Sequence, residues 1–298
     1  EDAAPYPVYN VTNIASSSPH NPAGGGHGFC SAPLRGSGTH FSMKGGSVGP
    51  TTADETVVGL DDSSIGYSGL PQYWTLDGVN FHDARWTNDC NGGGQACHTE
   101  NLYLTGVLDF TIKNSRFEYC GNSACVFITK QSGQSSPDRI NLYGNVFNHT
   151  GSPSVDYAAD ISPSSTYTFA FNSVVDSSIL ASGGNVTMSN NIASNNPCPG
   201  FSTTGSKSFD HNLWIYDTST GGSADQCGST DRTYNVAHNP GNDIWVSAAT
   251  GDYHLKSGTN PAIDIANPSG TSLVPADYYG QSRPCGSAPD VGVAERCP

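Results

Sequence analysis

Basic residues are scarce in this sequence, and charged residues of both signs are few. Charged side chains make up 13% of the 298 residues, and 12 Lys and Arg stand against 26 Asp and Glu, which gives a net charge of −14. A surface with that balance repels phosphate backbones and anionic lipid head groups. We therefore expect neither nucleic acid nor a membrane as a partner, whereas a neutral polysaccharide meets no such repulsion.

Two structural patterns are also missing. No apolar run approaches the roughly 20 residues that a membrane-spanning helix needs. No segment keeps a helical period over the roughly 11 residues of an average helix, so strand–helix–strand crossovers are not expected. The 35 Gly and 19 Pro instead suit tight turns between short strands.

None of the nine cysteines forms the CxxC pattern of a zinc site. A cytosolic enzyme seldom carries so many, so we predict disulfides and a secreted, extracellular protein. The first residues, Glu1 and Asp2, fit a chain from which a signal peptide has been removed. The spacing favours the close pairs Cys90–Cys97, Cys120–Cys125 and Cys285–Cys297, with Cys30 as the unpaired thiol.

A short block recurs along the chain. Its first and third positions are usually apolar, as a strand with one buried face requires, and its fifth position is Gly or Asn in five copies. Stacked turns of this kind would let side-chain amides hydrogen-bond from coil to coil. The copies are WTLDGVNF (74–81), FTIKNSRF (110–117), INLYGNVF (140–147), TFAFNSVV (168–175), VTMSNNIA (186–193) and KSFDHNLW (207–214).

Second strands recur between these blocks, at 101–105, 125–129 and 158–162. The sequence therefore predicts an all-β fold, a single-stranded right-handed parallel β-helix. It would occupy residues 40–298, with a C-terminal closing module from about 236 and a Gly- and Ser-rich segment or cap over 1–39. The alternative is a β-sandwich with irregular loops.

The strand series and the ending of the chain resemble the secreted right-handed parallel β-helix repeat proteins, which have a pectate lyase- and polygalacturonase-like architecture. The likeness covers about residues 40–298 and implies action on carbohydrate, since characterised relatives are mostly polysaccharide lyases and glycoside hydrolases. The ending is similar to the closing module of many bacterial members, in the segments GDYHLKSGTNPAIDIA (251–266), DYYGQSRP (277–284) and PDVGVAE (289–295).

Residues 98–130 are similar in layout to the catalytic coils of polygalacturonase-type hydrolases. Glu100 stands where those enzymes carry an Asp, and Asn122 and Ser123 stand in the turn where they carry carboxylates. Asn and Ser cannot protonate a leaving oxygen or activate water as a carboxylate pair does. The resemblance thus implies a class of substrate but not this mechanism.

A candidate binding surface follows if the three second strands stack in register. Tyr103, Phe127 and Asp160 would then form an outward column, and aromatic rings beside a carboxylate are typical of a sugar-binding surface. Arg139, which closes the following loop, is a further substrate-binding candidate. The alternative is that long loops fold over the rings and bury them.

Candidate catalytic residues lie on the same coils. Hydrolysis of a glycosidic bond needs two carboxylates roughly 5 to 9 Å apart, and the candidates are Glu100, Asp156 and Asp160. β-Elimination needs a cation and a base, for which Lys130 is the first candidate. The alternative is that these are turn caps and solvated charges.

His82, Asp83 and His98 flank a long loop, and their convergence would make a metal site. Ca²⁺ is the cofactor to expect if the site, or a bridge to an acidic substrate, needs a cation. The alternative is that they are ordinary turn residues.

The sequence as a whole predicts an extracellular carbohydrate-active protein. It would bind a polysaccharide along the outer sheet near residues 98–162 and cleave it by hydrolysis or β-elimination. The alternative is a non-catalytic glycan-binding or structural surface solenoid, in which free strand edges at an end coil would favour self-association.

Overall fold

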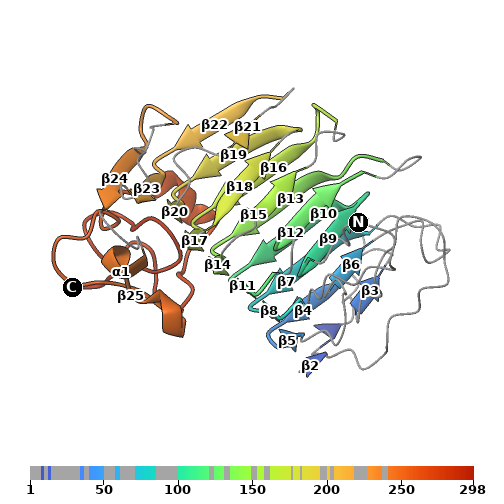
Figure 1. Ribbon diagram of the computed structural model, residues 1–298, viewed down its shortest axis with the longest axis horizontal. Helices are drawn as coiled ribbons and strands as arrows, with labels where there is room; N and C mark the ends of the chain where they lie inside the picture. Colours follow the sequence, from blue (N-terminus) through green and yellow to red (C-terminus); the bar gives the residue numbers. More distant parts are fainter. Residues whose placement is uncertain are drawn as a thin grey trace.

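Three parallel sheets make up most of the computed structural model (Figure 1). We call them sheets A, B and C, and the chain visits them in turn. The structure describes residues 8–9, 13–14, 34–36, 40–49, 58–60, 71–84, 100–120, 124–130, 135–148, 153–157, 162–175, 177–181, 183–194, 200–201, 205–217, 227–236 and 241–298.

Sheet A has eight strands, in the order β1 (Val8–Tyr9), β4 (Ser42–Lys44), β7 (Gln72–Asp77), β10 (Leu108–Lys113), β13 (Asp138–Tyr143), β16 (Thr166–Ala170), β19 (Asn185–Ser189) and β22 (Lys207–Asp210). Sheet B has nine, in the order β2 (Asn13–Ile14), β5 (Ser47–Val48), β8 (Asn80–His82), β11 (Arg116–Glu118), β14 (Val146–Asn148), β17 (Ser173–Val175), β20 (Ile192–Ser194), β23 (Leu213–Asp217) and β24 (Arg232–Val236). Sheet C has seven, in the order β3 (Leu34–Gly36), β6 (Val58–Leu60), β9 (Leu102–Thr105), β12 (Val126–Thr129), β15 (Pro153–Tyr157), β18 (Ser178–Ala181) and β21 (Gly200–Phe201).

The fold is all-β with parallel sheets, as predicted, and it is compatible with a β-helix. One apolar core takes side chains from all three sheets, for example Leu76 of sheet A, Phe117 of sheet B and Ile128 of sheet C. On sheet B, Phe81, Phe117 and Phe147 stack in successive strands with ring centroids 4.8 Å apart at each step. Alternation of buried and outward side chains along each strand produces this shared interior.

The recurring block forms sheet A and the turn into sheet B. The prediction was wrong by one residue in the fourth copy, because Ile140 pairs with Tyr167 and the copy therefore begins at 167. When the copy begins at 167, Phe171 is its fifth residue and lies in the turn, with a positive φ of 56°. A further copy that the sequence pattern missed is FSMKGGSV (41–48), whose Ser42 pairs with Thr75.

A buried amide ladder follows the sixth position of the block. Asn145, Asn172 and Asn191 each use Nδ2 and the backbone N–H to donate to Oδ1 of the Asn in the next coil, at 2.8–3.0 Å. Asn212 donates in the same way to Asp231 Oδ1, at 2.9 and 3.1 Å. The predicted coil-to-coil amide ladder is confirmed, one position later in the block than the fifth.

The register of sheet C differs from the prediction. Phe127 pairs with Tyr103 on one side and with Asp156 on the other. The third strand is β15, at residues 153–157, and its Asp156 takes the paired position that was predicted for Asp160. Asp160 itself lies outside the described residues.

Residues 241–298, which we call the C-terminal segment, lie against the outer face of sheet B (Figure 1). The segment holds α1 (Gly241–Ile244), the antiparallel pair β25 (Trp245–Ser247) and β26 (Asp252–Leu255), and 3₁₀ turns at Ala248–Thr250 and Pro268–Ser272. Val146, Ile192 and Leu213 of sheet B belong to a second apolar cluster with Trp245 and Val293, whereas their neighbours in the strands belong to the main core. The segment therefore covers the side of the stack.

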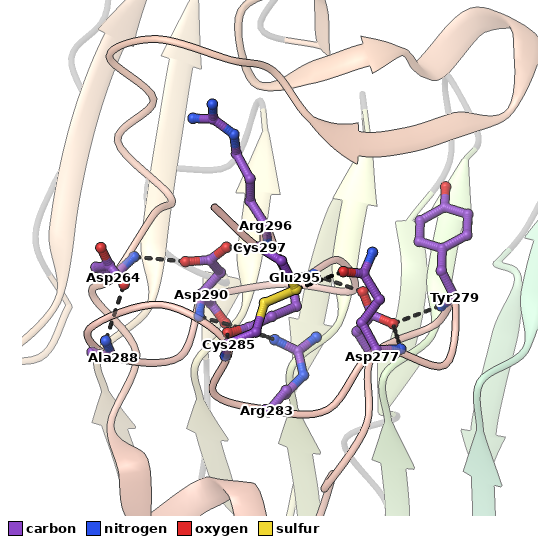
Figure 2. Close-up of a disulfide and its surroundings, with 11 residues drawn as sticks. Asp264, Asp277, Tyr279, Arg283, Cys285, Ala288, Asp290, Glu295, Arg296 and Cys297 are labelled. Atoms are coloured by element: carbon purple, nitrogen blue, oxygen red, sulfur yellow. Dashed lines mark hydrogen bonds and ion pairs between the residues drawn. A yellow bond between two sulfur atoms is a disulfide. The ribbon is translucent and has the colours of Figure 1, made fainter.

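A buried ion pair holds the end of this segment together (Figure 2). Arg283 Nη1 donates to Glu295 Oε2 at 2.9 Å, both side chains are at most 1% exposed, and Nη2 donates to the carbonyl of Gly292 at 2.6 Å. The guanidinium also lies 4.4 Å from the ring centroid of Phe171. The pair thus ties the chain end to the turn of sheet A.

Two predicted disulfides are confirmed, Cys120–Cys125 and Cys285–Cys297. Cys30, Cys90 and Cys97 lie outside the described residues. Within the described part of the chain, no helix has the length and apolar character needed to cross a membrane.

Candidate functional site

The predicted aromatic column on sheet C exists, but it is less open than expected. The rings of Tyr103 and Phe127 are neighbours, with centroids 5.6 Å apart and planes inclined by 35°. Phe127 lies between buried Val126 and Ile128 and is partly exposed, whereas Tyr103 is only 8% exposed. Of these two rings, Phe127 therefore offers the larger accessible surface.

Two of the predicted catalytic residues, Glu100 and Lys130, do not come together, and Asp160 lies outside the described residues. Glu100 is fully buried just before β9. Lys130 follows β12, four residues beyond Val126, which pairs with Leu102. Four residues of strand separate Lys130 from that pair by about 13 Å. Glu100 lies on the other side of that pair. Asp156 lies in the strand beside Phe127, on β15.

Arg139 lies on sheet A and not beside the sheet C column. Its guanidinium makes a two-pronged bond to Asp109, from Nε to Oδ1 at 2.5 Å and from Nη2 to Oδ2 at 2.7 Å. Nη1 also donates to Asp138 at 2.5 Å. The hydrogen bond from Arg139 lowers the pKa of the Asp109 carboxyl, and the bond to Asp109 raises the pKa of Arg139. Both groups are therefore charged at neutral pH.

Four outward residues align on consecutive strands around this ion pair, and we call them the sheet A strip: His40, Tyr73, Asp109 and Arg139. Phe110 pairs with Trp74 and with Ile140, so Asp109 lies between Tyr73 and Arg139. The rings of His40 and Tyr73 stack with centroids 4.7 Å apart, and Tyr73 is 50% exposed. At about 4.8 Å per rung, the strip is about 14 Å long.

The strip shares an uncommon backbone conformation. His40, Tyr73, Asp109 and Arg139 all have positive φ, of 63°, 57°, 52° and 54°. Each non-Gly residue in this left-handed region costs roughly 1–2 kcal/mol. Local strain that recurs on four strands at one surface marks a candidate functional site.

A column of hydroxyl and amide side chains runs beside the strip on the outer face of sheet A. Strand pairing aligns its members, and all of them are at least partly exposed. Together with the strip they give sheet A a polar outer face rich in hydrogen-bonding groups. The members are Ser42, Thr75, Thr111, Asn141, Thr168, Thr187 and Ser208.

A pocket of about 320 Å³ lies where sheet A meets the C-terminal segment, between Lys113 and Tyr143 on one side and Asp277 and Tyr278 on the other. Lys113 pairs with Asp77 across neighbouring strands at 3.5 Å. Burial raises the pKa of both Tyr143 and Tyr278. The two tyrosines are thus neutral hydrogen-bonding groups at ordinary pH.

The expected metal residues are arranged differently. Both ring nitrogens of His82 have partners, since Nδ1 lies 2.7 Å from Asp83 Oδ2 and Nε2 lies 2.7 Å from Ser47 Oγ. His98 lies outside the described residues. In the part of the chain that the structure describes, no three His, Cys, Asp or Glu side chains form a group that could hold a metal.

Neither a protein-family model nor a curated protein sequence matches the chain.

Proposed function

We propose that this chain is an extracellular right-handed parallel β-helix that binds a polysaccharide along the outer face of sheet A. The observation that carries the proposal is the sheet A strip, in which exposed Tyr73 stacks on His40 beside the Asp109–Arg139 ion pair. The three sheets would close around the shared core as a solenoid. The disulfides are compatible with an extracellular location.

The strip combines the two kinds of contact that a sugar needs. An exposed aromatic ring offers an apolar face to the C–H side of a sugar ring, and charged groups bind hydroxyls through strong hydrogen bonds. A guanidinium has five N–H donors, and Arg139 directs three of them at Asp109 and Asp138. Two donors then remain for the hydroxyl groups of a ligand.

The ligand class follows from charge. The strip and its neighbour Asp138 carry two carboxylates against one guanidinium, and the whole chain carries −14. A polyuronate would be repelled, whereas a neutral polysaccharide would not. Binding rather than cleavage is proposed, because Glu100 is buried and lies on the far side of a rung from Lys130.

The test is a binding titration with a panel of neutral and uronic polysaccharides, followed by affinity electrophoresis. Tyr73→Ala should weaken binding of a neutral chain by about tenfold, since a well-placed aromatic contact contributes up to about 1.5 kcal/mol. Phe127→Ala is the matched control on sheet C and should leave binding unchanged. Absence of binding across the panel would overturn the proposal, and loss of binding only in Phe127→Ala would move the site to sheet C.

A further inference from the structure

Three side chains on sheet B are joined in series at the surface. Ser47 Oγ lies 2.7 Å from His82 Nε2, and His82 Nδ1 lies 2.7 Å from Asp83 Oδ2. The His82 side chain is 21% exposed and that of Asp83 is 50% exposed. A serine, a histidine and an aspartate are thus linked in the order in which nucleophile, base and orienting carboxylate act in acyl transfer.

The parallel register brings these residues together. Ser47 of β5 pairs with Asn80 of β8, and Val48 pairs with Phe81 and is buried, so Ser47 faces outward. His82 then lies opposite Gly49. A Cβ atom at Gly49 would lie 2.0 Å from the carbonyl oxygen of His82, so only glycine permits this approach.

The local backbone places Asp83 on the other side of the imidazole. Asp83 has a positive φ of 54°, which ends the strand directly after His82. A carboxylate can only accept, so in the neutral ring Nδ1 carries the proton that faces Asp83, and Nε2 presents a lone pair to the Ser47 hydroxyl. This is the tautomer that a general base requires.

We infer that Ser47, His82 and Asp83 form a serine esterase centre that hydrolyses short O-acyl esters on a polar carrier. The substrate class follows from the surroundings, since the neighbouring outward side chains on sheet B are Asn80, Arg116 and Glu118. A polar surface of this kind suits a small acyl group attached to a hydroxylated molecule. The inference goes beyond the binding proposed for sheet A and uses other residues.

Asn80 is the side chain best placed to stabilise the oxyanion. It lies directly beside Ser47 in the strand register, and its Oδ1 is buried without a hydrogen-bond partner. Because Oδ1 can only accept, the oxyanion role falls to the Nδ2 donors of the same amide. A side-chain amide can donate an N–H to the developing negative charge, as in other oxyanion sites.

The reaction balances without a cofactor. The Ser47 hydroxyl gives its proton to His82 Nε2 while Oγ bonds to the acyl carbon. The ester C–O bond then breaks, and the leaving alcohol takes the proton from His82. Water next gives a proton to His82 and attacks the acyl-Ser47 ester. The bond to Oγ breaks, Ser47 recovers the proton, and a carboxylic acid leaves.

The first test is covalent labelling. The intact protein would be treated with a fluorophosphonate probe, and the labelled peptide would be identified by mass spectrometry. Ser47 should carry the label in the wild type, and labelling should disappear in Ser47→Ala. Labelling should also fall in His82→Gln, because the hydroxyl loses its base.

Hydrolysis of p-nitrophenyl acetate gives the second readout. His82→Gln should slow it by roughly 10²- to 10⁴-fold, as expected for the loss of a general base. His254→Gln is the matched control, since His254 makes the same Nδ1 contact with Asp252 at 2.6 Å but stacks on Tyr279. That variant should keep both labelling and hydrolysis.

Two results would overturn the inference. One is a wild-type protein whose Ser47 stays unlabelled and whose hydrolysis equals the buffer rate. The other is hydrolysis that survives Ser47→Ala in protein with an unchanged near-ultraviolet circular dichroism spectrum. Failure of polysaccharide binding with intact Ser47 labelling would refute only the proposal for sheet A.

Discussion

The two halves of sheet B belong to the same parallel sheet, but the side chains on their outer faces differ in polarity. In β5 and β8 the outward side chains are polar and partly exposed, and they include Ser47, Asn80 and His82. From β14 to β23 the outward side chains are mostly apolar and lie under the C-terminal segment, and the polar ones, such as Asn148 and Ser173, bond to that segment. Arg116 of β11 marks the boundary, with its guanidinium 5.4 Å from the ring centroid of Tyr253.

The difference shows that the outer chemistry of a sheet depends on what packs on it. Burying one side chain such as Ile192 or Leu213 contributes roughly 1.5–3 kcal/mol. The covered half can therefore attach the C-terminal segment, while the uncovered half keeps groups that can meet a ligand. The hydrogen-bonded backbone is the same in both halves.

The largest expected effect comes from breaking the buried ion pair between Arg283 and Glu295 in the C-terminal segment. Arg283→Met should lower the free energy of unfolding by about 3–5 kcal/mol, because it leaves the Glu295 carboxylate buried without its cation. Burial raises the pKa of Glu295, so its folded form binds a proton more tightly than its unfolded form. The loss should thus grow as the pH rises from 5 to 8.

Denaturant titrations at pH 5 and at pH 8 would measure this loss. Glu295→Gln in the same background supplies the control, since it removes the charge and should abolish the pH dependence. Equal stability of Arg283→Met and wild type would show that the pair does not hold the C-terminal segment.

A smaller effect should follow from exchanging a polar and an apolar side chain between the two halves of sheet B. Val146 and Asn80 lie in one column, two strands apart. Val146→Asn buries an amide among apolar side chains and should cost about 1–3 kcal/mol. Asn80→Val should change thermal stability by less than about 0.5 kcal/mol. Equal costs for the two changes would remove the distinction between the halves.

Two glycines of the uncovered half sharpen the comparison further. Gly49→Ala should cost about 1 kcal/mol more than Gly45→Ala, because a Cβ at Gly49 meets the His82 carbonyl, whereas a Cβ at Gly45 meets nothing within 4 Å. The backbone adds to this difference, because φ is 68° at Gly45, in the left-handed helical region, but 128° at Gly49, well outside it. Labelling of Ser47 should be lost only in Gly49→Ala, and its retention would mean that the approach of β5 to His82 does not matter.

The smallest effect is expected at the solvent-exposed ion pair between Asp109 and Arg139. Arg139→Gln should change stability by less than about 1 kcal/mol, since the pair with Asp109 is screened by solvent. The pKa of Asp109 is lowered by Arg139, so the pair contributes at neutral pH and is lost only below the ordinary value of 3.8. Carbon-13 titration should show that pKa rising towards 3.8 in the variant, and an unchanged titration would contradict the assignment.

The repeat could be read from the sequence because the same residue types recur at each sheet A strand and turn. The first residue of the fourth copy could not be predicted correctly, since an aromatic residue is not expected at positive φ in the turn. Phe171 adopts that conformation because it is buried beneath Arg283 and Gly270 of the C-terminal segment. Tertiary packing there outweighs the local preference.

The candidate sites were harder to predict than the fold. His82 and Asp83 were noticed as neighbours, but Ser47 joins them only through the pairing of β5 with β8. The block containing Ser47 carries Gly46 at the position where later coils carry Asn, so it did not stand out as a repeat. Likewise Arg139 was expected beside Phe127, and only the strand register places it next to Asp109.

The amide ladder gives the stack a direction. Every link donates towards the C-terminal coils, and the last acceptor is Asp231, whose second oxygen accepts from Trp214 Nε1 and from the backbone of Gly228. An ionised carboxylate accepts without donating, so the series ends there with no proton left over. A coil duplicated inside the stack would keep donors and acceptors matched. A coil appended beyond Asp231 could continue the ladder only if an amide side chain, which both donates and accepts, replaced this carboxylate.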